Sequence, residues 1–175
     1  MLTVLRILLV IPFVWALLSE QYQLALGLLF VAGVTDGLDG FLARQYGWYT
    51  WFGSVADPIA DKILLVASYL ILGYLGHLPH WLVYLVVGRD LVIFSGSVLY
   101  WRLVGHFEGK PSLLGKACTF SLILYGLLVL VHLAVYAVPQ GVISAGAWLV
   151  AVLCAASGAH YVYLGIVKTR ESRAS

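Results

Sequence analysis

Four aspartates between residues 36 and 61 have the types and the spacing to do chemistry in this 175-residue chain. Asp36 and Asp39 are three residues apart, so they would share one face of a helix. Asp57 and Asp61 are four residues apart and would share one face of a second helix. If the two helices lie side by side, the four carboxylates converge and repel one another unless cations lie between them. The spacing therefore predicts a site for divalent metal ions.

Each aspartate alone could instead be a helix cap or a solvated loop residue. Asp57 precedes Pro58, which fits an N-cap followed by proline at the first helical position. Capping explains one of the four aspartates at most. A carboxylate inside a bilayer costs about 2.5 to 3.5 kcal/mol on insertion scales, so four of them in an apolar stretch favour a functional site.

The residues around the aspartates suit a phosphate ligand. Hard cations such as Mg²⁺ take oxygen ligands and combine protein carboxylates with substrate phosphates. Two divalent ions would balance four carboxylates and could clamp the oxygens of a phosphoryl displacement. Arg44 offers a planar fork for phosphate oxygens, and Gly40, Ala43 and Gly53 leave space beside the backbone for a bulky ligand. A diphosphate held by two metal ions at the membrane surface is the expected chemistry.

The composition predicts an all-α integral membrane protein with a single domain over residues 1–175. Hydrophobic residues make up 62% of the chain and charged residues 10%, whereas a soluble domain has about 25% charged residues. The mean hydropathy is +0.98. Cys118 and Cys154 lack metal-ligand spacing and are expected to be buried small residues. The apolar segments predict six transmembrane helices, since a span needs about 20 residues; they lie at 2–18, 22–44, 54–76, 79–104, 112–137 and 142–167.

The distribution of Lys and Arg predicts the orientation of these helices. The loops at 19–21, 77–78 and 138–141 contain no Lys or Arg, and the basic residues lie towards the side that carries both termini. The positive-inside rule makes that side cytoplasmic. The aspartates would then lie at the cytoplasmic ends of the second and third spans, within reach of a soluble substrate or of a lipid in the inner leaflet.

The motif resembles the signature of a known family. It reads Asp36-x-x-Asp39-Gly40-x-x-Ala43-Arg44, eight residues, then Gly53-x-x-x-Asp57-x-x-x-Asp61. All eight defining positions are similar to those of the CDP-alcohol phosphatidyltransferase family, and the similarity runs from about residue 2 to residue 120. The flanking residues Thr3, Arg6 and Pro12 also resemble the start of that family.

The resemblance implies a role for each residue of the motif. Asp36, Asp39, Asp57 and Asp61 would hold two Mg²⁺ or Mn²⁺ ions. Asp61 would also be the general base that takes the proton of the acceptor hydroxyl. The CDP-linked donor would be bound by Asp36, Gly40, Ala43, Arg44 and Gly53. The family further implies CDP-diacylglycerol as donor, release of CMP, a homodimer among membrane lipids, and a multi-pass protein of the bacterial cytoplasmic membrane whose site faces the cytoplasm. No nucleic-acid partner is expected.

The sequence resembles two branches of the family that use different acceptor alcohols. Lys116 follows Gly115, and family members with phosphate-bearing acceptors carry a similar Gly-Lys pair. Arg89 and Lys116 are therefore the candidate acceptor-binding residues, although Arg89 could instead form a structural ion pair with Asp90. Gly88-Arg89-Asp90 resembles cardiolipin synthases, which use phosphatidylglycerol. The chain size and the Gly-Lys pair resemble phosphatidylglycerophosphate synthases, which use glycerol 3-phosphate.

Two other functions could use acidic residues in a membrane. A membrane prenyltransferase also binds a diphosphate through Mg²⁺ and aspartates, but its two aspartate-rich motifs lie far apart in sequence, and here the two halves are adjacent. A divalent-cation transporter lines its path with carboxylates. In this chain the acidic residues gather on one side, which suits a site open to one side better than a path across the bilayer.

Overall fold

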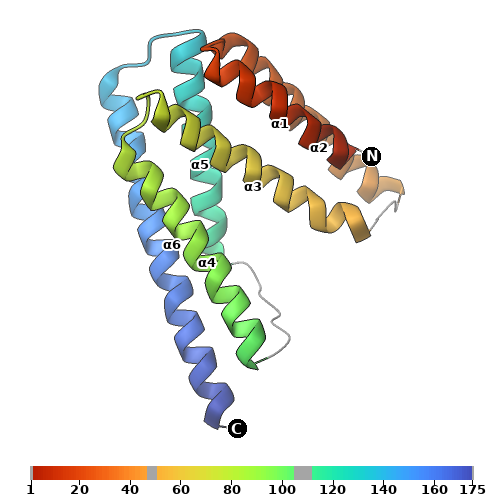
Figure 1. Cartoon of the computed structure of the whole chain (residues 1–175), viewed down its shortest axis with the longest axis vertical. Coiled ribbons are helices and arrows are strands. Elements are labelled where there is room, and N and C mark those ends of the chain that lie inside the picture. Colours follow the sequence, from red (N-terminus) through yellow and green to blue (C-terminus); the bar gives the residue numbers. More distant parts are fainter. Residues whose placement is uncertain (1, 47–50, 105–111, 175) are drawn as a thin grey trace. The chain divides into compact units, whose positions relative to one another are not determined.

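The computed structural model describes residues 2–46, 51–104 and 112–174, with side chains for 8–35, 61–96 and 112–165. The described residues form six α-helices and no strand (Figure 1). The helices are α1 (Leu2–Leu18), α2 (Tyr22–Tyr46), α3 (Trp51–Tyr74), α4 (His80–Val104), α5 (Leu113–Ala134) and α6 (Gln140–Ala174). The predicted all-α class is confirmed.

Two helix boundaries differ from the prediction in ways that matter. Helix α3 begins at Trp51, so Asp57 lies inside the helix, and its interpretation as an N-cap is wrong. Helix α6 continues past the predicted end at 167 to Ala174. The added stretch contains Lys, Arg and Glu, which are good helix formers without being apolar. A search for apolar spans therefore stops before the helix does.

The first of two compact units comprises residues 1–78 and 126–139. Within it, α1 packs against both α2 and α3. Phe13 of α1 and Tyr69 of α3 are almost fully buried. A hydrogen bond of 2.7 Å between Tyr22 Oη and His77 Nε2 joins the start of α2 to the turn after α3. The two helices that carry the aspartates thus belong to one unit and share α1 as a packing partner.

The second unit comprises residues 79–125 and 140–175. Here α4 and α6 run side by side in the same direction (Figure 1, green and blue). Val86 of α4 and Val150 of α6 are buried, and the rings of Trp81 and Trp148 lie against each other at an interplanar angle of 34°, with centroids 5.2 Å apart. This unit carries both candidate acceptor-binding residues.

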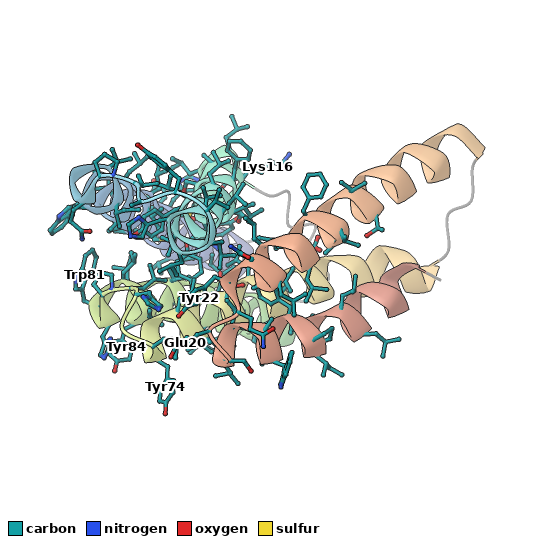
Figure 2. All side chains as sticks on the ribbon, turned by 90° about the horizontal axis from the view of Figure 1, so that it is seen from above. Glu20, Tyr22, Tyr74, Trp81, Tyr84 and Lys116 are labelled. Atoms are coloured by element: carbon teal, nitrogen blue, oxygen red, sulfur yellow. The ribbon has the colours of Figure 1, made fainter. Side chains whose placement is uncertain are left out.

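Large apolar side chains are exposed on all six helices, as Figure 2 illustrates with its projecting side chains. Ile11 is 68% exposed, Phe30 72% and Phe94 69%. Apolar surface of this extent needs a cover of lipid or protein. Among the described residues, Leu113–Ala134 and Gln140–Gly165 have the length and hydropathy of a membrane span, and Leu8–Leu18 and Tyr22–Thr35 are shorter apolar helical segments. Six spans and cytoplasmic termini remain predictions.

Candidate active site

Both halves of the aspartate motif lie on continuous helix. Asp36 and Asp39 are on α2, and Asp57 and Asp61 are on α3. The α-helical spacing of about 3.6 residues per turn places the members of each pair one turn apart on one face. This part of the prediction is confirmed by the backbone. The two helices also belong to the same compact unit.

The prediction that the four carboxylates converge depends on side chains outside those that the structure describes. Within the motif, only the Asp61 side chain is described, and it is exposed. The other motif residues are placed by their helices alone; they are Asp36, Asp39, Gly40, Ala43, Arg44, Gly53 and Asp57. Where side chains are described, no three of the His, Cys, Asp and Glu residues come together as a metal site. The ligand set therefore stays a prediction.

The donor chemistry of the motif fits hard divalent ions. Its four side chains provide only carboxylate oxygens, in two pairs, each spaced by one helical turn. Oxygen donors are what Mg²⁺ and Mn²⁺ prefer, and the preference of Mg²⁺ for one or two carboxylates plus phosphate leaves room for a substrate. The two pairs could hold two such ions.

A groove of about 390 Å³ lies in the first unit, away from this motif. It is lined by residues 20–24, around the turn from α1 to α2, and by Leu133 and Ala134 at the end of α5. Asp36 is fourteen residues beyond Tyr22 along α2, which corresponds to about 20 Å at 1.5 Å per residue. This groove is not the candidate active site.

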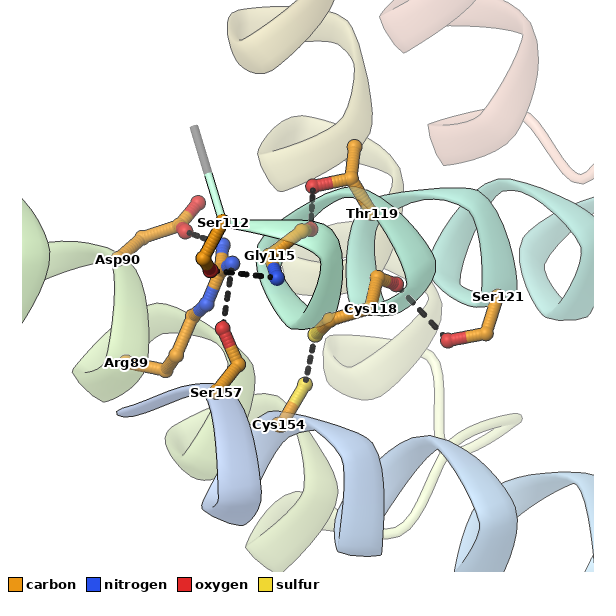
Figure 3. A network of polar contacts seen from close by, with 9 residues as sticks. All are labelled: Arg89, Asp90, Ser112, Gly115, Cys118, Thr119, Ser121, Cys154 and Ser157. Carbon is orange, nitrogen blue, oxygen red and sulfur yellow. Dashed lines mark hydrogen bonds and ion pairs between the residues drawn. The ribbon is translucent and has the colours of Figure 1, made fainter. Parts of the chain in front are cut away.

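A buried polar network surrounds Arg89 in the second unit (Figure 3). Arg89 Nη1 donates to Asp90 Oδ1 at 2.7 Å, and Nη2 donates to Ser157 Oγ at 3.0 Å. The side chains of Arg89 and Asp90 are 8% and 12% exposed, and Ser157 is fully buried. The ion pair considered from the sequence is present. Arg89 Nε is buried, and its N–H has no hydrogen-bond partner among the described groups.

Lys116 lies in the first turn of α5, and its side chain is exposed (Figure 2). Its backbone N–H donates to Ser112 O at 3.1 Å, and Ser112 Oγ accepts the Gly115 N–H at 3.0 Å. Ser112 is therefore the N-cap of α5. An exposed ammonium on a capped helix start is accessible to an anionic headgroup.

Three polar contacts of the second unit have no signal in the sequence. Ser157 and Tyr161 of α6 look like ordinary polar residues in an apolar span. Only the structure shows that Ser157 contacts Arg89 of α4 and that Tyr161 contacts Ser112 at the start of α5. Cys118 and Cys154 are both buried, as expected, but their sulfurs lie 3.2 Å apart across α5 and α6. Nothing in the sequence spacing predicts that these two thiols meet.

Comparison with known proteins gives a match over most of the chain. The family model for CDP-alcohol phosphatidyltransferase matches residues 1–156. The match extends past residue 120, where the similarity read from the sequence ended, and it reaches into α6 as far as residue 156.

Relatives with three different names are similar to this chain. A probable phosphatidylglycerophosphate synthase of Mycobacterium tuberculosis is 35% identical over 168 residues, covering 92% of this chain and 78% of that protein. A CDP-diacylglycerol--glycerol-3-phosphate 3-phosphatidyltransferase of Bacillus subtilis is 32% identical over 133 residues, covering 72% of this chain and 68% of that protein. The cardiolipin synthase (CMP-forming) of Rattus norvegicus is 38% identical over 89 residues, which are 50% of this chain and 29% of that protein. The chain thus spans less than a third of the rat relative.

Proposed function

The chain belongs to the CDP-alcohol phosphatidyltransferase family, and we propose that it transfers the phosphatidyl group of CDP-diacylglycerol to a hydroxyl acceptor and releases CMP. The complete motif from Asp36 to Asp61, carried on the continuous helices α2 and α3, is the observation that supports this proposal most directly. The reaction belongs to phospholipid biosynthesis.

The aspartates divide between two tasks in this proposal. Asp36, Asp39, Asp57 and Asp61 hold two divalent ions, Mg²⁺ or Mn²⁺. When bound, these ions neutralise the charge of the diphosphate and of the departing CMP. Asp61 lies one turn after Asp57, and its exposed side chain is accessible to a substrate. Asp61 therefore serves as the general base.

The remaining motif residues bind the donor. Arg44 lies on α2 beyond the aspartate pair and holds the diphosphate of the CDP-linked lipid through its planar fork. Gly40, Ala43 and Gly53 have no side chain or a small one, which leaves room for the nucleotide.

The bond changes follow from this arrangement. The acceptor hydroxyl gives its proton to the Asp61 carboxylate, and its oxygen forms a bond to the lipid-side phosphorus. The bond from that phosphorus to the oxygen of CMP breaks, and CMP leaves with the electron pair.

The acceptor carries a phosphate group in this proposal and is glycerol 3-phosphate or phosphatidylglycerol. Lys116 is exposed at the start of α5, and Arg89 has a buried N–H without a partner among the described groups. Both residues therefore have donors for the oxygens of a phosphate. The Bacillus subtilis relative, whose name includes glycerol 3-phosphate, favours that acceptor, and the cardiolipin synthase of Rattus norvegicus favours phosphatidylglycerol.

The setting of the reaction is the bacterial cytoplasmic membrane. Six spans, both termini and the motif facing the cytoplasm, and a homodimer complete the proposal. The exposed apolar side chains on all six helices and the absence of Lys and Arg from three alternate loops support the membrane topology.

The test is product identification. Purified protein is incubated with CDP-diacylglycerol and, in separate reactions, glycerol 3-phosphate, phosphatidylglycerol, serine or inositol phosphate, and the lipid product is identified by mass. We expect CMP and a new phospholipid with one phosphate-bearing acceptor. If CMP is released with none of the acceptors, the proposed activity is wrong. In that case, transfer from a prenyl diphosphate or metal flux into vesicles would identify the two other functions considered.

A further inference from the structure

One stripe of α6 contacts both elements that carry the candidate acceptor-binding residues. Ser157 and Tyr161 are four residues apart, so they lie one above the other on one face of α6. Ser157 accepts a hydrogen bond from Arg89 of α4. Tyr161 Oη accepts the backbone N–H of Ser112, at the start of α5, over 3.3 Å. All of these residues belong to the second unit.

Ser112 connects Tyr161 to the first turn of α5. Its Oγ accepts the Gly115 N–H, and its carbonyl oxygen accepts the Lys116 N–H. The residue that Tyr161 contacts is thus the same residue that caps the helix. Hydrogen bonds through Ser112 therefore connect the Tyr161 hydroxyl to the backbone of Gly115 and Lys116.

Gly115 is the glycine at which this contact leaves no room for a side chain. A Cβ built there would lie 2.7 Å from Tyr161 Oη, 3.1 Å from Tyr161 Cε2 and 3.2 Å from Ser112 Oγ. At Gly126 of the same helix, the nearest atom would be Tyr69 Cε2 at 3.6 Å, an ordinary van der Waals distance. The glycine before Lys116 therefore allows the phenol of Tyr161 to lie against the helix start.

We propose that Tyr161 is a positioning residue for the acceptor: through Ser112 and Gly115 it fixes the first turn of α5, so that the Lys116 ammonium meets the phosphate of the acceptor. The inference rests on the proposed function, because it assigns Lys116 to that phosphate. Tyr161 itself contacts the helix start and not the substrate. Its removal should therefore weaken acceptor binding without affecting donor binding or the chemical step.

The first test uses thermal unfolding and does not depend on activity. Alanine normally stabilises a helix interior relative to glycine, so Gly126→Ala, the matched control in α5, should raise the Tm. Gly115→Ala should lower it, because the methyl group collides with the Tyr161 hydroxyl. Adding Tyr161→Phe to Gly115→Ala removes the worst collision and should recover a large part of the loss. A Tm above the wild type for Gly115→Ala alone, or no recovery of the Tm in the double variant, would show that Tyr161 does not restrict position 115.

The second test separates positioning from simple structural support. Tyr161→Phe removes one hydrogen bond and should raise the KM for the phosphate-bearing acceptor about fivefold. The kcat and the KM for CDP-diacylglycerol should stay within about twofold, since no contact to the donor changes. Tyr163→Phe is the control, because Tyr163 is exposed on the same helix. An unchanged acceptor KM, or an equal loss in all three constants, overturns the positioning role.

The two tests also distinguish this inference from the proposed function. If the wild-type protein transfers to no acceptor, the proposed function and the assignment of Lys116 both fail, while the Tm series still decides the Tyr161–Gly115 contact. If the wild-type protein is active and Tyr161→Phe leaves the acceptor KM unchanged, only the inference fails.

Discussion

At the residue scale, the two aspartates of α3 should respond differently to loss of charge. Asp57 is predicted to hold a metal ion, whereas Asp61, one turn later, also takes the acceptor proton. Asp61→Asn should lower the transfer rate by about 10²–10⁴-fold, the usual contribution of a general base, and leave metal-dependent binding of the CDP-lipid in place. Asp57→Asn should lower the transfer rate and also weaken the metal-dependent binding of the CDP-lipid. Donor binding and CMP release are measured on the same preparations.

Transfer at the normal rate by the Asp61→Asn protein would contradict the assignment of the base. An equal loss of donor binding in both variants would contradict the expected difference between the two aspartates.

The buried pair of Arg89 and Asp90 gives a second prediction at this scale. Replacing one member leaves the other charge buried and uncompensated, which costs about 3–5 kcal/mol in known cases. Asp90→Asn should therefore unfold at a clearly lower temperature than the wild type. The double variant Arg89→Met/Asp90→Leu removes both charges and should regain most of the stability. Thermal unfolding in detergent measures both.

The double variant also tests the second role given to Arg89. A stable protein that still binds the phosphate-bearing acceptor with its normal KM would show that Arg89 is structural only. Wild-type thermal stability of Asp90→Asn would show that the ion pair contributes little.

At the element scale, α1 and α3 end in the same way but with different residues. After α1, Gln21 N–H donates to Ala16 O and Glu20 N–H to Leu17 O; after α3, His77 N–H donates to Leu72 O and Gly76 N–H to Gly73 O. Both are Schellman motifs, which place one residue in the left-handed conformation. That residue is Glu20 with φ 55° in the first case and Gly76 with φ 81° in the second.

Because Glu20 has a side chain and Gly76 has none, replacing each by the other type of residue should change the stability in opposite directions. A left-handed residue with a side chain costs about 1–2 kcal/mol, so Glu20→Gly should stabilise the protein by about 1 kcal/mol. Gly76→Ala should destabilise it by a similar amount, and only through the backbone, because a Cβ there meets nothing within 4 Å. Gly27→Ala, inside α2 and also in open space, is the control and should stabilise. The order of the three Tm values checks the prediction, and a Tm above the wild type for Gly76→Ala would contradict it.

The helices themselves could largely be predicted from the sequence, because long apolar runs and turn residues determine them. The start of α3 and the end of α6 could not, since both stretches are helical without being continuously apolar. The placement of each pair of aspartates on one helix face could be predicted from helical periodicity. The contacts of Ser157, Tyr161, Cys118 and Cys154 could not, because they depend on which faces of α4, α5 and α6 meet, and the hydrophobic pattern of a helix that is apolar all round does not specify a face.

At the scale of the whole molecule, the proposed topology places the turn after α1 outside the cell and the start of α5 inside. Single cysteines at these points can report this once Cys118 and Cys154 are replaced by serine. A membrane-impermeant maleimide should label Glu20→Cys in intact cells. It should label Lys116→Cys only after the membrane is opened. Labelling of Lys116→Cys in intact cells would contradict the orientation and the cytoplasmic site.

The central claim is that the aspartates of α2 and α3 act through divalent ions that hold the CDP-linked lipid. The most direct measurement is CMP release from CDP-diacylglycerol after metal removal by EDTA, followed by addition of Mg²⁺ or Mn²⁺. The account predicts that chelation abolishes CMP release, that either ion restores it in the wild type, and that neither restores it in Asp57→Asn at the same concentration. Full activity after exhaustive chelation would contradict the claim.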